Sequence, residues 1–327
     1  MTKLLLSAHC SLSNFAMLPL IYHPIYSQLP LPEGHRYPIM KYQFLYDAIM
    51  EKTQNDTNWQ QEITFFSPQA LTLQDIKQVH DADYVDMLAC GQLPANKMRR
   101  IGFPWSEALM QRTLTSAAGT VLTAHKAIES GVAIHLSGGY HHAHNDFGSG
   151  FCLFNDLVLA AHFSLQKDDI HKVLIIDSDV HHGDGTATLC QGRDDIITLS
   201  FHCDKNFPAR KPDSDLDVPL TRGTGDETFL ACFQQVVQMA INLHRPDLVI
   251  YDAGVDLHRD DELGYLDIST QAIYLRDLFL LQTMQDNHIP VAAVVGGGYR
   301  AKHKDLVPVH FQLFQAALDL SLNSDSE

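Results

Sequence analysis

Titratable side chains crowd the end of one apolar segment in this chain of 327 residues. Residues 173–176 are apolar and mostly β-branched, as in a strand that is buried on both of its faces. Five titratable groups follow within eight residues: Asp177, Asp179, His181, His182 and Asp184. Because charged groups at the end of a buried strand need partners or a metal ion, the segment predicts a site for a divalent cation.

The spacing of these groups suits chelation of one ion. Side chains alternate along a strand, so Asp177, Asp179 and His181 would point to the same side. Asp179 and His181 then offer one carboxylate and one imidazole, and two glycines allow a turn before a helix that starts near Thr186. The alternative is a polar turn between strand and helix, with a capping aspartate and ordinary buried histidines.

Three other apolar segments end in the same manner, with glycines beside polar residues. They are VAIHL before SGGYHHAHND, DLVIY before DAGVD, and VAAVV before GGGYR. In a parallel sheet the carboxyl ends of the strands share one edge, so these endings would converge. Asp256 would then join Asp179 and His181, and two carboxylates with one imidazole suit a catalytic Zn²⁺ with open positions. The oxygen-rich set also suits Fe²⁺ or Co²⁺.

The remaining polar residues of these endings suit proton transfer. His141 and His142 are adjacent in a glycine-rich turn, where two neighbouring imidazoles fit general acid–base work better than chelation. Asp177 and Asp184 are available to orient them, which gives two His–Asp dyads. Tyr299 follows three glycines and could donate a hydrogen bond to a developing oxyanion. In the competing interpretation, the two histidines and the tyrosine only pack against their neighbours.

The elements that must carry these residues alternate between strands and helices. Strands are expected near residues 19–22, 63–66, 132–136, 173–176, 196–202, 247–251 and 290–295, and the longest helices at 107–130 and 226–244. This alternation predicts an α/β fold of three layers, with a mostly parallel central sheet and helices on both faces. Residues 91–106 and 203–220 are expected to be loops. We expect one domain at 19–320, after an extension at 1–18 and before a frayed tail at 321–327.

Composition narrows the classes of protein. The net charge of −16 argues against nucleic acid as a partner. It mildly favours cationic substrates such as lysine-rich peptides or polyamines, and the alternative is that it only keeps the protein soluble. The six cysteines are scattered without a CxxC pair, so we expect free thiols in a reducing cytoplasm. No stretch approaches the ~20 apolar residues of a membrane-spanning helix, and we expect no membrane association.

Taken together, the strand endings resemble the arginase/deacetylase superfamily, and within it the histone deacetylases and acetylpolyamine amidohydrolases. The matching strings, in family order from about Pro19 onward, are GGYHHAHNDFGSGFCLFND, IIDSDVHHGDGT, LSFH, AGVDLHRDDELG and GGGYR. Their form is most similar to class IV-like and bacterial single-domain members. The resemblance implies a zinc ion held by Asp179, His181 and Asp256.

The resemblance also implies a role for each catalytic residue. His142 would be the general base and then the general acid, oriented by Asp184. His141, paired with Asp177, would be its electrostatic partner. Tyr299 would polarise the scissile carbonyl.

Three further sites are implied by the same resemblance. The substrate tunnel would be lined by Gly150, Phe151 and Phe207. A structural K⁺ or Na⁺ would be held by Asp177, Asp179, Ser200 and the backbone of His181 and Phe201. The arginine of an inner channel for acetate would be Arg36.

The resulting hypothesis is a zinc-dependent amide hydrolase that removes acetyl or longer acyl groups from lysine or another primary amine. Its partner would be an acyl-lysine peptide or protein, or an acylated amine. The chain departs from the family in two ways: residues 91–106 contain no obvious rim aspartate of the kind that class I members use to grip the substrate backbone, and no long insertion narrows the entrance. The alternatives are a binuclear manganese ureohydrolase of the arginase type and a catalytically silent acyl-lysine binding module.

Overall fold

One parallel sheet forms the centre of the computed structural model, which describes residues 17–324. Its strands are β1 (Leu18–Ile21), β2 (Ile63–Phe66), β3 (Val132–His135), β4 (Val173–Asp177), β5 (Ile196–Cys203), β6 (Leu216–Leu220), β7 (Leu248–Asp252) and β8 (Val291–Val294). They lie in the order β2-β1-β3-β8-β7-β4-β5-β6, and every neighbouring pair is parallel. The sheet is therefore parallel throughout the described residues, where the sequence predicts one that is mostly parallel.

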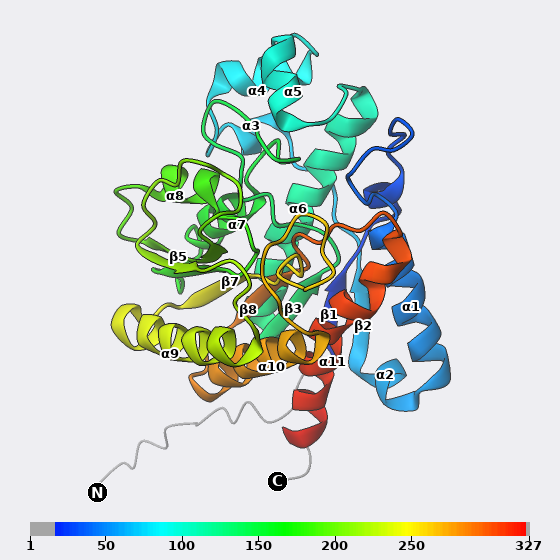
Figure 1. The fold of residues 1–327 in the computed structure, drawn as a ribbon, viewed down its shortest axis with the longest axis vertical. Helices are drawn as coiled ribbons and strands as arrows, with labels where there is room; N and C mark the ends of the chain where they lie inside the picture. Colours follow the sequence, from blue (N-terminus) through cyan, green and yellow to red (C-terminus); the bar gives the residue numbers. More distant parts are fainter. Residues whose placement is uncertain (1–16, 325–327) are drawn as a thin grey trace, which may run out of the picture.

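Helices cover both faces of this sheet, which confirms the predicted three-layer α/β fold (Figure 1). The helices are α1 (Lys41–Asn55), α2 (Thr57–Glu62), α3 (Leu73–Ile76), α4 (Ala82–Ala89), α5 (Ala95–Ile101), α6 (Glu107–Ser130), α7 (Asp156–Ser164), α8 (Asp184–Cys190), α9 (Asp226–His244), α10 (Thr270–Asp286) and α11 (Val307–Ser324), with short 3₁₀ helices η1 (Pro24–Ser27) and η2 (His303–Leu306). Helices α6 and α7 pack on each other and on central strands, whereas α9, α10 and α11 form a second group. Helices α3, α4 and α5 gather at one end of the molecule (Figure 1).

Two expected loops contain regular structure. Residues 91–106 include α5, which follows Pro94 and ends at Gly102 with a φ of 91°. A proline before the first turn and a glycine after the last turn are helix boundary residues, so here they bracket a short helix instead of preventing one. Residues 203–220 include β6, an edge strand whose residues alternate between half-buried and exposed. Its polar composition resembles a loop because one of its faces is solvated.

The ends of the chain differ from the expected domain boundaries. Strand β1 begins at Leu18, within the extension expected at 1–18, of which residues 1–16 lie outside the described part. Helix α11 runs to Ser324, so the tail expected from residue 321 begins inside a helix.

Among the residues that the structure describes, no helix is both long enough and apolar enough to cross a membrane.

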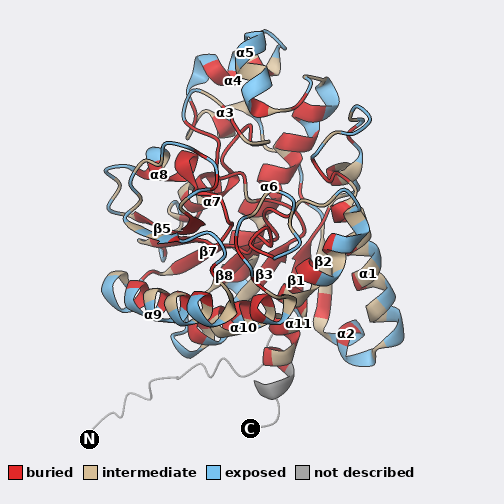
Figure 2. Ribbon diagram, in the orientation of Figure 1, coloured by how far each residue is buried: buried red, intermediate tan, exposed pale blue. Residues whose placement is uncertain are grey.

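Burial is deepest in the central strands, whose endings carry the polar groups (Figure 2). Every residue of β4, β5 and β7 is buried. The register places Asp177, at the end of β4, opposite Asp252 of β7 and Ser200 of β5. Parallel pairing thus brings the ends of distant segments to one edge of the sheet.

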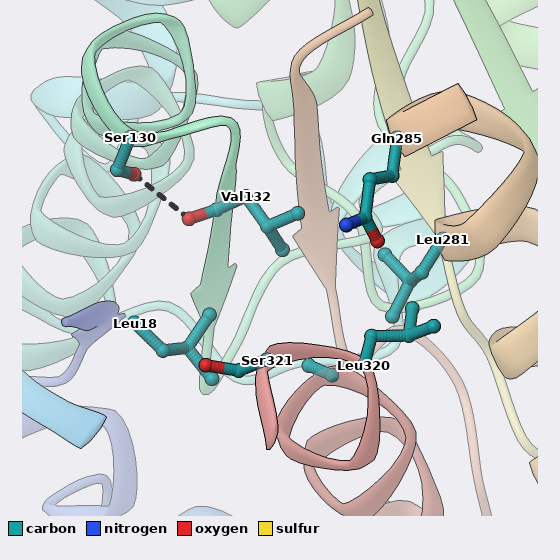
Figure 3. Close-up of a pocket in the computed structure, with 8 residues that line it drawn as sticks. Leu18, Ser130, Val132, Leu281, Gln285, Leu320 and Ser321 are labelled. Carbon is teal, nitrogen blue, oxygen red and sulfur yellow. Dashed lines mark hydrogen bonds between the residues drawn. The ribbon is translucent and has the colours of Figure 1, made fainter. Parts of the chain in front are cut away.

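A small pocket lies near the opposite edge of the sheet (Figure 3). It is lined by Leu18 and Val132, which begin β1 and β3, and by Leu281 and Ser321 from α10 and α11. The Ser130 hydroxyl donates a hydrogen bond of 2.9 Å to the Val132 carbonyl beside it. The pocket volume of about 20 Å³ has room for about one water molecule, so this pocket is too small for a substrate.

A buried arginine of α10 pairs with its neighbouring aspartate and ties the helix to the loop that follows β7. The Arg276 guanidinium and the Asp277 carboxylate are buried, and Arg276 Nε lies 2.9 Å from Asp277 Oδ1. Arg276 also donates to the carbonyl oxygens of Gly254 at 2.7 Å and Ala253 at 3.2 Å. These hydrogen bonds hold the backbone shortly before Asp256, one of the candidate metal ligands.

We expect Arg276→Met to lower the free energy of unfolding by about 3–5 kcal/mol, because the change leaves the Asp277 charge buried without its partner. Urea unfolding followed by circular dichroism measures the loss. The double variant Arg276→Met/Asp277→Asn should recover part of it, since no charge is then left unpaired. A single variant as stable as the parent would contradict this role for the ion pair.

Candidate active site

The candidate ligands Asp179, His181 and Asp256 meet at the carboxyl edge of the sheet. Asp179 and His181 follow β4, Asp256 follows β7, and all three are buried. His181 Nδ1 lies 2.9 Å from Asp179 Oδ1 and 3.0 Å from Asp256 Oδ2. One nitrogen and two carboxylate oxygens therefore lie within 4.8 Å of one another, close enough to share an ion.

Two glycines allow the carboxylates of this group to lie close together. A Cβ atom on Gly297 would collide with oxygens of both Asp179 and Asp256, and one on Gly254 would lie 2.9 Å from Asp179 Oδ2. Gly297 N–H donates to Asp179 Oδ2 at 3.2 Å. Burial, together with the neighbouring Asp179, raises the pKa of Asp256 to about 6, because two buried carboxylates repel each other. A divalent cation would relieve this repulsion, so the donor set fits a metal ion.

Two His–Asp dyads stand beside this group. His142 Nδ1–H donates to Asp184 Oδ1 at 2.6 Å, and His141 Nδ1–H donates to Asp177 Oδ2 at 2.7 Å. The structure thus brings together the members of both expected dyads, and each carboxylate fixes the tautomer of its histidine. The two Nε2 atoms lie 3.2 Å apart. Asp184 Oδ2 also lies 3.1 Å from His144 Nε2, a partner that the sequence analysis missed.

The surroundings shift the pKa values of the two histidines in opposite directions. Burial, together with the charge of His141, lowers the pKa of His142 to about 3. Burial also opposes the charged form of His141, but Asp177 and Asp179 outweigh it and raise the pKa of His141 well above its ordinary value. The surroundings therefore favour the neutral imidazole for His142 and the charged imidazolium for His141.

The loop after β7 holds Tyr299 by its backbone. Tyr299 N–H donates to Asp261 Oδ2 at 2.6 Å, and the Tyr299 carbonyl accepts from Glu262 N–H at 3.0 Å. Asp261 Oδ1 accepts from two further N–H groups of the same loop, at 2.8 and 3.0 Å. Burial raises the pKa of Tyr299, so the phenol keeps its proton. Asp261 was not among the predicted site residues, although the acidic pair before a glycine in DDELG is typical of such a turn.

A cavity of about 570 Å³ gives access to these groups. Its lining includes residues of the site and of the expected tunnel: His142, His181, Gly150, Phe151, Phe207 and Tyr299. Gly150 has a φ of 52°, and a Cβ atom there would lie 2.5 Å from the His142 ring. The ring centroid of Phe207 is 4.8 Å from that of His142. The residues expected to form a tunnel thus lie together in the wall of one cavity.

The buried cation near the site is Lys41 and not Arg36. Arg36 is exposed and lines the outer cavity, which corrects the inner position expected for it. Lys41 Nζ donates to the Gly296 carbonyl at 2.8 Å and lies 5.8 Å from the centroid of the Tyr299 ring. Burial lowers the pKa of Lys41 to about 8, although nearby carboxylates favour its charged form. Lys41 could not be singled out from the sequence, because a lysine at the start of a helix is ordinarily exposed.

Two further groups of side chains within the described residues could hold ions. They are His141 with Asp177 and Asp252, and His182 with His202 and Asp217. Asp252 Oδ2 has no hydrogen-bond partner in this part of the chain, and burial, with the neighbouring Asp177, raises the pKa of Asp252 well above its ordinary value. Ser200 lies beside Asp177 in the sheet, and its hydroxyl is 3.1 Å from His202 Nδ1. The K⁺ or Na⁺ site that includes Ser200 and Phe201 stays a prediction.

Comparison with known proteins agrees with this fold. Residues 37–311 match the family model of the histone deacetylase domain. An uncharacterized protein of a Picosynechococcus species is 41% identical over 302 residues, which cover 92% of this chain and 99% of that protein. Histone deacetylase 2 of Arabidopsis thaliana is 31% identical, over 69% of this chain and 60% of its own length. Acetoin utilization protein AcuC of Staphylococcus aureus is 30% identical, over 71% of this chain and 65% of its own length.

The solved structure of the HDA15 HD domain shares the fold. It superposes with a TM-score of 0.76 at 20% sequence identity and covers 93% of this chain and 90% of its own. A parallel sheet of this topology, together with the matched family model and relatives, defines a hydrolase of the deacetylase type. The chain belongs to the histone deacetylase family.

We expect a divalent cation to stabilise the protein through Asp179, His181 and Asp256. After treatment with a chelator, Zn²⁺ at about 100 times its dissociation constant should raise the free energy of unfolding by about 2.7 kcal/mol, which thermal unfolding detects as a higher Tm. Asp256→Ala should abolish the rise, because the ion loses a carboxylate ligand. The matched variant Asp217→Ala, in the separate group with His182, should keep it. If Asp217→Ala abolished the rise and Asp256→Ala kept it, the principal metal site would be the group of His182, His202 and Asp217.

Proposed function

We propose that this protein is a zinc-dependent amide hydrolase that removes an acetyl or longer acyl group from lysine or another primary amine. The observation that carries the proposal is that one cavity is lined both by His142, the base of the dyad with Asp184, and by His181, a member of the ligand group with Asp179 and Asp256. A base and a metal site beside one opening are the parts that hydrolysis of an unactivated amide requires. Membership of the histone deacetylase family supports the same chemistry.

The His142–Asp184 dyad transfers the protons, and the His141–Asp177 dyad has an electrostatic role. Neutral His142 accepts a proton from the water that attacks the acyl carbonyl, while Asp184 fixes the Nδ1–H of its ring. Protonated His142 then donates this proton to the nitrogen as the C–N bond breaks, which leaves a carboxylate and a free amine. The charge on His141 stays on its dyad with Asp177 and stabilises negative charge nearby. Asp179, His181 and Asp256 would hold the Zn²⁺, which would supply Lewis-acid chemistry that polarises the carbonyl and makes the water more acidic.

Tyr299 and Lys41 act on the negative charge that the reaction creates. Tyr299 donates its hydroxyl proton in a hydrogen bond to the carbonyl oxygen as that oxygen gains charge. The hydrogen bonds between the Tyr299 backbone and Asp261 and Glu262 position the phenol for this role. Lys41 lies beneath the Tyr299 ring as a buried cation available to the carboxylate product.

The number of bound ions separates this proposal from a binuclear ureohydrolase. A second ion would need His141, Asp177 and Asp252 as ligands. His141 Nδ1 and Asp177 Oδ2 already form a hydrogen bond, which favours one catalytic ion. Metal analysis that finds two manganese ions per chain would favour the ureohydrolase. A metal-loaded protein that binds acyl-lysine without releasing product would instead be a binding module.

We expect His142→Ala to lower kcat/KM on an acetyl-lysine reporter by about 10²–10⁴-fold, because it removes general acid–base catalysis. Tyr299→Phe should cost about 10²–10³-fold through the lost oxyanion donor. Cys152→Ala is the control, since Cys152 is buried and burial raises the pKa of its thiol, which makes it a poor nucleophile. It should retain most of the turnover. Full activity in both His142→Ala and Tyr299→Phe would contradict the proposed mechanism.

Asp261 should act through Tyr299 as a positioning residue. We expect Asp261→Asn to lower kcat about 10- to 100-fold with little change in KM, because a displacement of ~1 Å in a catalytic group has effects of that size. The same substitution in a Tyr299→Phe background should have little further effect, since the hydroxyl that it positions is already gone. Equal losses in the two backgrounds would show that Asp261 supports the fold generally. Thermal unfolding of each variant confirms that it is folded.

A further inference from the structure

The mouth of the cavity carries positive charge although the protein is acidic. Arg36, Arg100 and Lys205 line it against one acidic residue, Glu262, in a chain whose net charge is −16. Lys205 lies 3.4 Å from the Asp204 carboxylate, which partly neutralises it. The two arginines therefore dominate the charge of the mouth.

Arg36 and Arg100 stand on the same side of this opening. His35 Nε2, on the residue before Arg36, lies 2.9 Å from the carbonyl of Gly102, two residues beyond Arg100. The two segments are thus adjacent, although 64 positions separate the arginines in the sequence (100 minus 36). The Arg100 guanidinium carbon lies 3.9 Å from the centroid of the Phe147 ring, which holds its plane in place.

Neither arginine forms an ion pair within residues 17–321. The arginine ion pairs of this part of the chain belong to Arg193, Arg259, Arg276 and Arg300. A guanidinium stacked on an aromatic ring still presents the N–H groups along its edge, and these match a carboxylate with two parallel hydrogen bonds. Glu262, the acidic residue of the lining, accepts from the Ala301 N–H at 2.6 Å and is held toward the loop that follows β8. The arginine pair is therefore available to an anionic ligand.

We propose that Arg36 and Arg100 bind a carboxylate of the substrate, so that the substrate is an acylated amine which also carries a carboxylate group. This inference rests on the proposed amide hydrolysis and adds the chemical class of its substrate. It reverses the preference for cationic substrates that the net charge alone indicates. An acylated polyamine would bring positive charge to two unneutralised guanidinium groups, and like charges at close range repel.

Two substrates that differ in one group test the inference. Nε-acetyl-lysine with a blocked α-amine is prepared with either a free α-carboxylate or an α-carboxamide, so that the scissile amide is identical. The metal-loaded parent enzyme should cleave the carboxylate with a kcat/KM about 10-fold higher or more, since one charge-assisted pair is of that order. The difference should lie in KM, because a contact remote from the reacting bond is made equally in the ground and transition states.

The variants R36Q and R100Q should each reduce this preference, and the double variant should abolish it while the carboxamide is cleaved as before. Lys52→Gln is the matched control, because it removes one positive charge from the far end of α1, where Lys52 pairs with Asp56. Added salt should reduce the preference of the parent enzyme, a measurement that needs no variant.

Three results would overturn the inference. Equal kcat/KM for the two substrates in the parent enzyme would do so, as would a preference that survives in R36Q/R100Q. Faster cleavage of an acetylpolyamine than of the carboxylate substrate would also do so. In each of these cases the enzyme still hydrolyses an amide, so the proposed function stands. Absence of turnover on every substrate would instead reject the proposed function, and this inference with it.

Discussion

The parallel register of β4 and β7 is the constraint on which the rest of the site depends. It sets Asp177 opposite Asp252, so the segments that follow the two strands leave the sheet side by side. Asp179 and Asp256 reach His181 for this reason, although they are distant in the sequence. A slip of one residue would turn every side chain of a strand to its other face, so the apolar core and the polar edge are specified together. Imidazoles and backbone N–H groups compensate the buried carboxylates, and a bound cation would compensate them further.

Patterns of residue type predicted seven of the eight strands of the described sheet and the edge at which their polar endings meet. Buried parallel strands are continuous apolar runs, and they end where polar residues and glycines begin, so both the strands and their functional edge are visible in the sequence. The two short elements α5 and β6 were missed for a physical reason. Helix α5 is bounded by residues that also occur in loops, and β6 is solvated on one side, so neither has an apolar run of its own.

The residues that escaped the sequence analysis are those whose role comes from tertiary surroundings. Lys41 is a buried cation only because the turn at Gly296 closes over it, and a lysine in an amphipathic helix gives no sign of that. Asp261 acts through backbone groups, and the turn that DDELG indicates does not show that its carboxylate will also hold the distant Tyr299 N–H. The charge of the mouth was likewise hidden, since the net charge sums over a whole surface while Arg36 and Arg100 come together through one local contact. The polar strand endings could be predicted from the sequence, whereas the approach of Arg36 to Arg100 could not.

The edge strand β6 has a consequence for the behaviour of the protein at high concentration. The last strand of a sheet has backbone groups that another molecule can pair with, and such pairing leads to aggregation. Strand β6 carries the exposed residues Asp217 and Pro219, a charge and a residue without an N–H group. Both features discourage strand addition from a second molecule. The polar composition that makes β6 resemble a loop therefore also protects the fully buried strand β5 beside it from intermolecular pairing.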